Sequence, residues 1–447
     1  MLYKHFLILI VLASTASALE AQTLSLREAM RRADSAAYAN RIATGQARAQ
    51  AGQATAALQG ILPTVRAEGG YVQTDDPLAA FGILLRQRAV TTASFNPDEL
   101  NFPPARTNWS GGLVAELPLI NADAWYGRAA ATAAAAAGAS QAGWTRESTR
   151  VQVVRAYFGA ILARDQVLTL EEATLAAHGH VRQAEALVAN GLATKSDALL
   201  AGVQAGRFDA DLIAARSGAA LARKRLALLL GAPADTAFVL PEGLPDSERI
   251  RALAASAADS STARLDVTAA QQGLAAAERD ASRATSRYLP RLNAFGRYDW
   301  NDPTNLFGGE KTYTIGVMAS WTPFAGASEI GDRQATHARA DAARAMVEAT
   351  EAQARLEQQA TASDVEVALA RLVIAETAVV QGAEAHRIVA RKYEGGLATV
   401  VELLGASAVD TQTRLGLAEA RYQAIVAEAA RRQAAGRDLA ALTTLEE

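Results

Sequence analysis

The sequence predicts an α+β membrane protein built from one structural repeat that is present in two copies. The segment leading into Pro63 recurs around Pro290, at an offset of 227 residues, and an Asp-Pro pair follows in both copies. The string NGLAT at 190–194 recurs as GGLAT at 395–399, at an offset of 205 residues. Repetition on this scale indicates a duplicated supersecondary unit, here helix, strand, loop, strand, long helix, turn and helix.

Residues 1–21 are typical of a secretory signal peptide. Lys4 provides a short basic start, residues 6–12 form an apolar run, and Ala16-Ser17-Ala18 fits a cleavage site, with a second candidate at Ala21. A transmembrane anchor is the less favoured alternative, because a spanning helix needs about 20 apolar residues. We therefore expect an exported chain that is cleaved near Ala18 or Ala21.

Composition excludes several classes of protein. The chain has no cysteine, so it forms no disulfide and cannot carry the acylated cysteine of a lipoprotein anchor. Its net charge of −3 argues against a nucleic-acid-binding surface. Alanine is abundant and aromatic residues make up only 6%, which favours helices packed closely along their lengths over a large globular core.

The first repeat is predicted to cover residues 22–231. Ser25 is a plausible N-cap with Glu28 as its capping-box partner, and the helix that follows should run to about Gly60. Strands are expected at 63–74 and 109–118, separated by a long loop that contains four prolines. A helix of about 65 residues, some 100 Å long, should follow and turn back at Gly191. Residues 232–246 are a linker.

The second repeat is predicted to cover residues 247–439. It should begin with one helix to about Arg287 and continue with strands at 290–300 and 313–323. The loop between these strands is shorter, which explains why the two offsets, 227 and 205, differ by 22 residues. A second helix of about 65 residues and a last helix from Val400 should follow. The tail 440–447 is expected to be polar and mobile.

Each predicted strand has about 10 residues and one apolar face, which suits a tilted strand that crosses a bilayer. Aromatic residues lie near the strand ends, as in the interfacial girdles of membrane barrels: Tyr71, Trp109, Tyr298, Trp300, Tyr313 and Trp321. An ordinary amphipathic sheet packed on a helix is the alternative. Because four strands cannot close a barrel and an open edge is not tolerated in hydrocarbon, several chains would have to combine their strands. The strands and helices together predict a homo-oligomeric barrel continued by a helical tube.

The chain resembles the TolC-type outer membrane efflux proteins, also called outer membrane factors, over nearly all of its length after the leader. The string YEGGLATVVELLGA at 393–406 is similar to the family pattern Y-x-x-G-x-x-T-x-x-[DE]-x-L-x-A. The resemblance implies a homotrimer with a 12-stranded β-barrel, four strands per chain, and a long α-helical coiled-coil tunnel in the periplasm. It also implies an exit duct for efflux or type I secretion, in outer-membrane lipid, with a periplasmic adaptor protein and an inner-membrane transporter as partners.

The same resemblance assigns two groups of residues. The two helical turns would form the adaptor-docking tip: Gly191, Leu192, Ala193, Thr194, Gly396, Leu397, Ala398 and Thr399. Glu402, with Tyr393 and Asp197, would form the periplasmic gate. Plain helix capping and a solvated charge are the structural alternatives. Ala398 and Gly405 replace an arginine and an acid found in other members, so the aperture is expected to be held differently.

No catalytic, cofactor or metal site is predicted. His178 and His180 are two residues apart and so do not share a helix face, and no phosphate-binding loop or nucleophile elbow occurs. A periplasmic scaffold or adhesin stalk without a channel remains an alternative, although it leaves the four strands unexplained. The loop 75–107 is expected to be ordered, either as a cap over the extracellular mouth or as an accessory surface.

Overall fold

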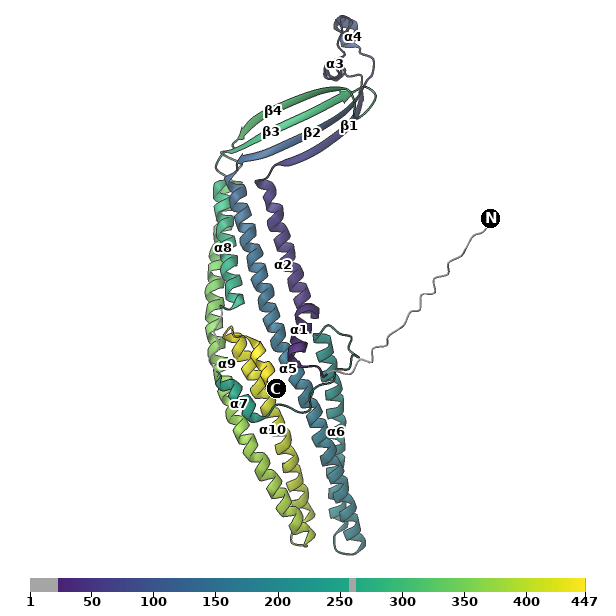
Figure 1. Cartoon of the computed structure of the whole chain (residues 1–447), viewed down its shortest axis with the longest axis vertical. Helices are drawn as coiled ribbons and strands as arrows, with labels where there is room; N and C mark the ends of the chain where they lie inside the picture. The colour runs from purple at the N-terminus through teal and green to yellow at the C-terminus, as the bar shows by residue number, and fades with distance from the viewer. Residues whose placement is uncertain (1–22, 257–262, 447) are drawn as a thin grey trace, which may run out of the picture. The chain divides into compact units, whose positions relative to one another are not determined.

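The computed structural model describes residues 23–256 and 263–446, so the predicted signal peptide 1–21 and its cleavage sites lie outside the described residues. The helices are α1 (Leu26–Ala36), α2 (Tyr38–Ala56), α3 (Pro77–Arg86), α4 (Pro97–Asn101), α5 (Ala122–Ala189), α6 (Lys195–Leu229), α7 (Ser247–Ala255), α8 (Leu265–Ser286), α9 (Ser328–Glu394) and α10 (Val400–Ala434). Short 3-10 helices are η1 (Ala57–Gly60), η2 (Thr92–Phe95) and η3 (Leu439–Leu445). Figure 1 shows α5 and α6 as a first helical hairpin and α9 and α10 as a second.

One antiparallel sheet contains the four strands in the order β1-β2-β3-β4. They are β1 (Thr64–Thr74), β2 (Arg106–Ile120), β3 (Arg291–Asp302) and β4 (Glu310–Ser320). β2 pairs with β3 although the long hairpin of the first repeat separates them in sequence. The sheet therefore joins the two repeats side by side, and β1 and β4 form its edges.

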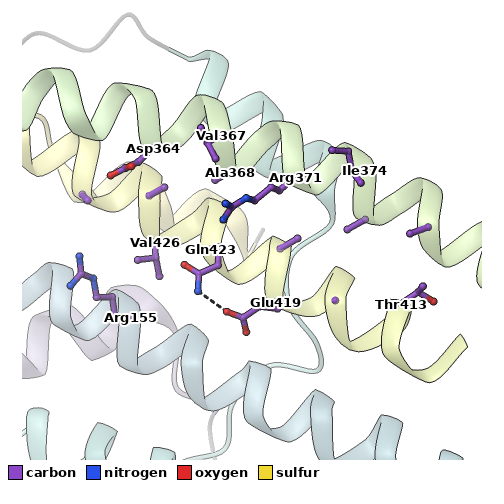
Figure 2. Close-up of a pocket in the computed structure, with 16 residues that line it drawn as sticks. Arg155, Asp364, Val367, Ala368, Arg371, Ile374, Thr413, Glu419, Gln423 and Val426 are labelled. Carbon is purple, nitrogen blue, oxygen red and sulfur yellow. Dashed lines mark hydrogen bonds between the residues drawn. The ribbon is translucent and has the colours of Figure 1, made fainter. Parts of the chain in front are cut away.

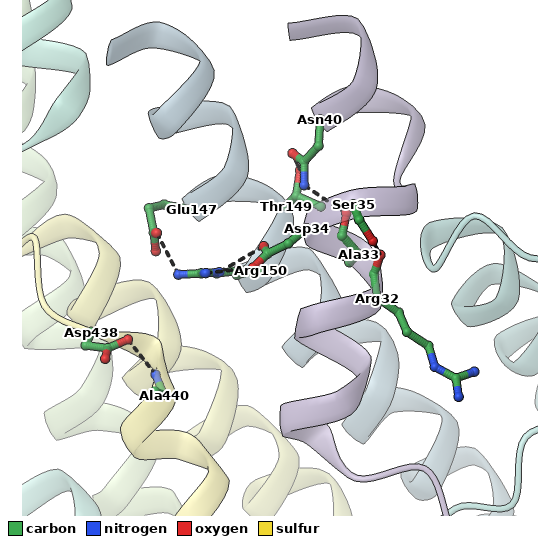
Figure 3. Close-up of polar contacts among 10 residues, drawn as sticks. All are labelled: Arg32, Ala33, Asp34, Ser35, Asn40, Glu147, Thr149, Arg150, Asp438 and Ala440. Carbon is green, nitrogen blue, oxygen red and sulfur yellow. Dashed lines mark hydrogen bonds and ion pairs between the residues drawn. The ribbon is translucent and has the colours of Figure 1, made fainter. Parts of the chain in front are cut away.

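The sequence predicts one helix from Ser25 to about Gly60, but the structure breaks it at Ala37, whose backbone is extended with ψ 132°. Side chains from α5 and α2 explain the break (Figure 3). Asn40 Nδ2 donates to the Ala33 carbonyl at 3.0 Å, and Asn40 Oδ1 accepts from Thr149 Oγ1 at 2.9 Å. The Ala33 carbonyl keeps its helical hydrogen bond from the Ala37 amide at 3.0 Å, so Asn40 adds a second donor to it and ties the first turn of α2 to the end of α1.

Arg150 of α5 fastens the same bend. Its guanidinium donates to both carboxylate oxygens of Asp34, at 3.0 and 2.7 Å, and to Glu147 at 2.9 Å. Bidentate contacts of this kind are stronger and more directional than single ones. Burial raises the pKa of Glu147, and the Arg150 charge opposes that rise.

The expectation of a polar, mobile tail at 440–447 is wrong for the residues that the structure describes. Residues 439–445 form η3, and Leu439, Leu442 and Leu445 are buried in the main core beside α1 and α7. Glu446 accepts from the Leu26 amide at 2.8 Å and from the Tyr157 hydroxyl. The tail is therefore part of the core, since leucines spaced by three place their side chains on one face of a short helical turn.

Two further segments differ from the sequence-based expectation. The single helix predicted for 247–287 is divided into α7 and α8, because the backbone leaves the helical region at Ser256. The loop 75–107 contains α3 and α4, each preceded by a side-chain N-cap at Asp76 or Asn96. A proline directly after each cap occupies the first helical position, where its missing N–H is not needed.

The chain forms two compact units, and their boundaries differ from those of the two sequence repeats. One unit comprises residues 23–41, 146–256 and 357–446, and the other comprises 42–145 and 263–356. Each unit thus draws chain from both repeats. The first contains the main core and both hairpin ends, whereas the second contains the sheet and α8.

Replacing Leu442 by alanine should reduce the free energy of unfolding by about 2–5 kcal/mol, because this fully buried side chain leaves a cavity. Urea denaturation followed by far-UV circular dichroism measures the change. Thr444→Ala is the matched control, since Thr444 is exposed and bonds only to the Ala441 carbonyl within the same turn. Equal effects of the two substitutions would contradict the packed position of η3.

Candidate functional site

The strand register places most of the apolar residues of the four strands on one face of the sheet, whereas Val72, Val114, Phe295 and Met318 lie on the other. Tyr71 is opposite Trp109, Gly111 is opposite Trp300, and Tyr298 is opposite Tyr313. Because side chains alternate along a strand, these pairs fix the face of every other residue. The aligned apolar positions are Val65, Ala67, Leu113, Ala115, Leu117, Leu292, Ala294, Ile315, Val317 and Ala319.

This apolar face is not covered by other described residues of the chain. Ile315 is 79% exposed and Val65 is 72% exposed, although both lie in regular strands. A large exposed apolar surface marks a site of contact with protein or lipid. The face therefore needs a partner that the single chain does not provide.

The predicted interface aromatics pack on one another and on glycines. The rings of Tyr71 and Trp109 have their centroids 4.8 Å apart, and those of Tyr298 and Trp300 are 6.2 Å apart. Trp300 lies over Gly111, where an added Cβ would approach the indole within 2.3 Å. Its indole N–H donates to the Leu306 carbonyl. The indole thus has an apolar body and a satisfied polar end, which is the character of interfacial tryptophan.

The remaining two predicted aromatics belong to the fourth strand. Tyr313 is exposed on β4, whereas Trp321 lies just beyond the end of the strand. Trp321 donates its indole N–H to the Tyr288 carbonyl at 3.1 Å, which ties the end of β4 to the segment before β3. Both rings remain largely exposed.

The opposite face of the sheet carries a connected set of charges. Arg66 contacts Glu68 at 3.2 Å and Glu116 at 3.5 Å, and Arg297 contacts Glu68 at 3.6 Å and Asp299 at 2.7 Å. Exposed ion pairs contribute at most about 1 kcal/mol each, so they set the polarity of this surface more than its stability. The sheet is thus apolar on one side and charged on the other.

The segment between β1 and β2 is fastened to one end of the sheet. Gln87 donates to Asn108 Oδ1 at 2.9 Å, and Asn108 in turn donates to Asn301 Oδ1 at 2.9 Å. Arg88 pairs with Glu310 of β4 at 3.4 Å. These contacts reach from β2 through β3 to β4, so the segment is ordered and lies at one end of the sheet (Figure 1).

The two hairpin turns have the same backbone geometry. Gly191 and Gly396 both have φ +72°. The amide of Leu192 donates to the Leu187 carbonyl at 2.9 Å, and that of Leu397 donates to the Lys392 carbonyl at 2.8 Å. Together with the glycine N–H bonds, this is the Schellman motif that ends a helix with a glycine in the left-handed region.

The predicted gate acids form capping boxes in the same turns. Thr194 and Thr399 are the N-caps of α6 and α10. Asp197 accepts from the Thr194 amide at 2.9 Å, and Glu402 accepts from the Thr399 amide at 2.7 Å. These backbone hydrogen bonds lower the pKa of Glu402, with a smaller contribution from Lys392. The T-x-x-[DE] spacing in the sequence is the local signal for these caps.

Tyr393 lies between the hairpins. It packs against a small cluster formed by Ala184, Ala201, Val400 and Leu404, which come from α5, α6 and α10. Burial, followed by the charge of Asp197, raises the pKa of the Tyr393 phenol. The structure thus brings Tyr393 near Asp197, whereas Glu402 stays on the exposed side of its own turn. Leu192 and Leu397 project at the turns and are 76% and 82% exposed.

A groove of about 560 Å³ lies along α9 and α10 (Figure 2). Its lining includes the apolar residues Val367, Ile374 and Val426 and the charged residues Asp364, Arg371, Glu419 and Arg155, the last from α5. Gln423 donates to Glu419 across one turn of α10 at 2.6 Å. These groups suit contact with an amphipathic helix.

Metal binding and helical membrane spans find no support among the described residues. Nowhere in 23–256 and 263–446 are three His, Asp or Glu side chains arranged to hold a metal ion. His178 pairs with Asp209 at 3.1 Å on the exposed side of the first hairpin. Within the same residues, no helix combines the length and the apolar character that crossing a membrane requires.

Comparisons with known proteins agree with this geometry. The family model described as outer membrane efflux protein matches residues 259–437. The outer membrane protein VceC of Vibrio cholerae is similar in structure, with TM-score 0.76, 20% identity, and coverage of 93% of this chain and 97% of that one. The Campylobacter jejuni CmeC outer membrane channel has TM-score 0.75 at 15% identity, covering 92% and 85% of the two chains. The open state of the Neisseria gonorrhoeae MtrE outer membrane channel has TM-score 0.72 at 16% identity, covering 92% and 89%.

No curated protein sequence matches the chain. The resemblance to outer membrane efflux proteins that the motif at 393–406 indicates is confirmed. The predicted fold class is confirmed as well, because these channels share the four strands and long helices over nearly the whole chain.

Gly396→Ala should destabilise the turn by about 1–2 kcal/mol, because a Cβ is strained at positive φ. Gly405→Ala is the matched control: it lies inside α10 with open space around it and should stabilise that helix by up to about 1 kcal/mol. Hydrogen exchange of the first-turn amides of α10 measures both, with faster exchange expected for the first variant and slower for the second. Equal exchange in the two variants would show that the left-handed glycine is not required.

Proposed function

We propose that this protein is an outer-membrane exit duct, in which three copies combine their strands into a 12-stranded barrel that continues as a helical tunnel. Transport through such a duct is passive. A periplasmic adaptor and an inner-membrane transporter would select the cargo and supply the energy. The match to outer membrane efflux proteins over 259–437 and the fold shared with VceC, CmeC and MtrE support this assignment.

One observation carries the proposal: a four-stranded sheet with an exposed apolar face, a charged opposite face and two free edges. In hydrocarbon every backbone polar group needs a partner within the protein, which closed barrels provide. If β4 of one copy pairs with β1 of the next copy, neither edge strand is left with unpaired backbone groups. The apolar face then meets lipid, and Arg66, Glu68 and Arg297 line water.

The hairpin turns are proposed as the adaptor-docking tip. The tip would consist of the turns Gly191 to Thr194 and Gly396 to Thr399, which have the same geometry. Each turn exposes one leucine side chain, Leu192 or Leu397. Three copies would offer six quasi-equivalent positions, which suits a hexameric adaptor. Helix capping alone explains the glycines and threonines, but it does not require exposed leucines at both turns.

Glu402, Asp197 and Tyr393 are proposed to form the periplasmic gate. The capping boxes hold the carboxylates of Asp197 and Glu402 in fixed positions. Rings of carboxylates around an axis attract cations and repel anions. Tyr393 packs between the two hairpins. A change in the distance between the hairpins would therefore also move this part of the gate.

Ile315→Lys should impair barrel assembly, because a lysine on the lipid face near the bilayer centre costs about 2–4 kcal/mol. Thr312→Lys is the matched control, since it lies on the charged face of the same strand, opposite Asp299. The yield of trimer in the outer-membrane fraction measures the effect, and only the first variant should lower it. A soluble wild-type chain, or equal losses in the two variants, would count against the membrane-facing sheet.

Glu402→Gln should lower the preference for cations in planar bilayers, because the amide oxygen can still accept from Thr399 while the charge is lost. Asp197→Asn makes the same change in the first hairpin. Reversal potentials in a salt gradient measure the ratio of cation to anion permeability. If both variants retain the wild-type ratio, neither carboxylate lines the pore.

A further inference from the structure

A polar layer interrupts the packing between the two hairpins. One small apolar cluster lies near the turns and contains Ala184, and a second lies farther along and contains Ala177. His180 is three residues after one of these alanines and four before the other, so all three share one face of α5. Since Ala177 and Ala184 are almost completely buried against the neighbouring helices, this face of α5 is an internal one.

One ring nitrogen of His180 lacks a hydrogen-bond partner in this layer. Its Nε2 atom is inaccessible to solvent and finds no partner among the described residues. Burial lowers the pKa of the His180 imidazole, and the nearby His386 lowers it further. A neutral ring can stay in this position, whereas a protonated ring would be a buried charge without a hydrogen-bond acceptor at Nε2.

The acidic groups around the layer are already engaged. Asp410 of α10 is 7% exposed, lies 3.5 Å from His386 Nδ1, and contacts Arg414 at 3.1 Å. Arg414 also contacts Glu172 of α5, at 3.4 Å. On α6, Asp209 pairs with His178. Protonation of His180 therefore adds a positive charge to a layer whose Asp410 carboxylate already faces Arg414 and His386.

Close helix packing leaves little room for these charges to move apart. Gly382 of α9 faces α10 next to Asp410, and an added Cβ there would come within 2.8 Å of Thr413 Oγ1. His386 follows Gly382 by four residues and so lies on the same face of α9. Repulsion in the layer is relieved most directly by separation of the hairpins.

We propose that His180, His386, Asp410 and Arg414 form a pH-sensitive contact that keeps the two hairpins packed while His180 is neutral and lets them separate when His180 is protonated. The direction of the pH effect follows from which of the two states, packed or separated, binds more protons. Because the packed state disfavours the His180 proton, the separated state binds more protons, and packing is fully stable above about pH 6.5 and weakens below it. Each unit of pKa depression changes the ratio of separated to packed chains by about tenfold.

The contact is a property of the chain itself, and its consequence rests on the proposed function. If the turns form the tunnel tip, separation of the hairpins in an acidic periplasm widens the periplasmic opening. The duct would then open more readily in acid, before any partner binds.

The absence of cysteine makes the hairpin separation directly measurable. Ala189→Cys and Glu394→Cys, at the exposed ends of α5 and α9, carry nitroxide labels. Labelled chains are diluted with unlabelled ones so that each assembly holds one labelled copy. Pulsed electron paramagnetic resonance at about pH 7.5 and about pH 5.5, on either side of the imidazole pKa, should show a longer, reversible distance component in acid. Superimposable distributions would overturn the proposal.

Two histidine variants test the mechanism. His180→Gln should abolish the acid-dependent component, whereas His178→Gln, two residues away and paired with Asp209 on the exposed side, should retain it. If the glutamine variant is already separated at the higher pH, His180→Phe replaces it, because that ring cannot take up a proton. A packed phenylalanine variant at both pH values supports the proposal, and a shift like that of the native chain overturns it.

Bilayer conductance separates this inference from the proposed function. Native conductance without a distance change refutes the pH-sensitive contact and leaves the duct intact. A distance change in a chain that conducts no ions supports the contact and refutes the duct.

Discussion

The unpaired edges of a four-stranded sheet are the constraint on which the rest of this structure depends. β1 and β4 each have one neighbour in the described chain, and one face of the sheet is apolar and uncovered. Backbone groups without partners cost several kcal/mol each in hydrocarbon. A head-to-tail ring of identical chains satisfies both edges through one repeated contact. The duplication supplies two strand pairs per chain, joined at β2 and β3, so the strands of each copy form one continuous sheet.

The helical turns show how one set of side chains can serve two purposes. In each turn a glycine ends one helix, and a threonine with an acid starts the next. The acid satisfies a backbone N–H that would otherwise lack a partner. In the proposed duct the same carboxylate also presents charge to the permeating ions. Because the cap fixes the carboxylate, the charge position depends on the backbone of the turn rather than on a flexible side chain.

Local patterns explain which features could be predicted from the sequence. Alternation along the strands and glycine at the turns are short-range signals, and they placed the sheet and the hairpins near their observed positions. The break at Ala37 depends on Thr149, which is distant in sequence, so helical periodicity alone cannot reveal it. Pro77 and Pro97 were interpreted as loop residues, although Asp-Pro and Asn-Pro pairs also begin helices. The capping boxes have a short-range signal, T-x-x-[DE], which fixes the threonine and the acid together.

The packing of η3 has a consequence for the order of folding. The single hydroxyl hydrogen of Tyr157 is shared between the Leu24 carbonyl, at 2.7 Å, and the Glu446 carboxylate, which also accepts from the Leu26 amide, 420 positions earlier. The main core therefore cannot close until residues 439–446 have arrived. A chain that emerges from its amino end would therefore keep this core open, with its leucines accessible, until the last of these residues has joined α1 and α7.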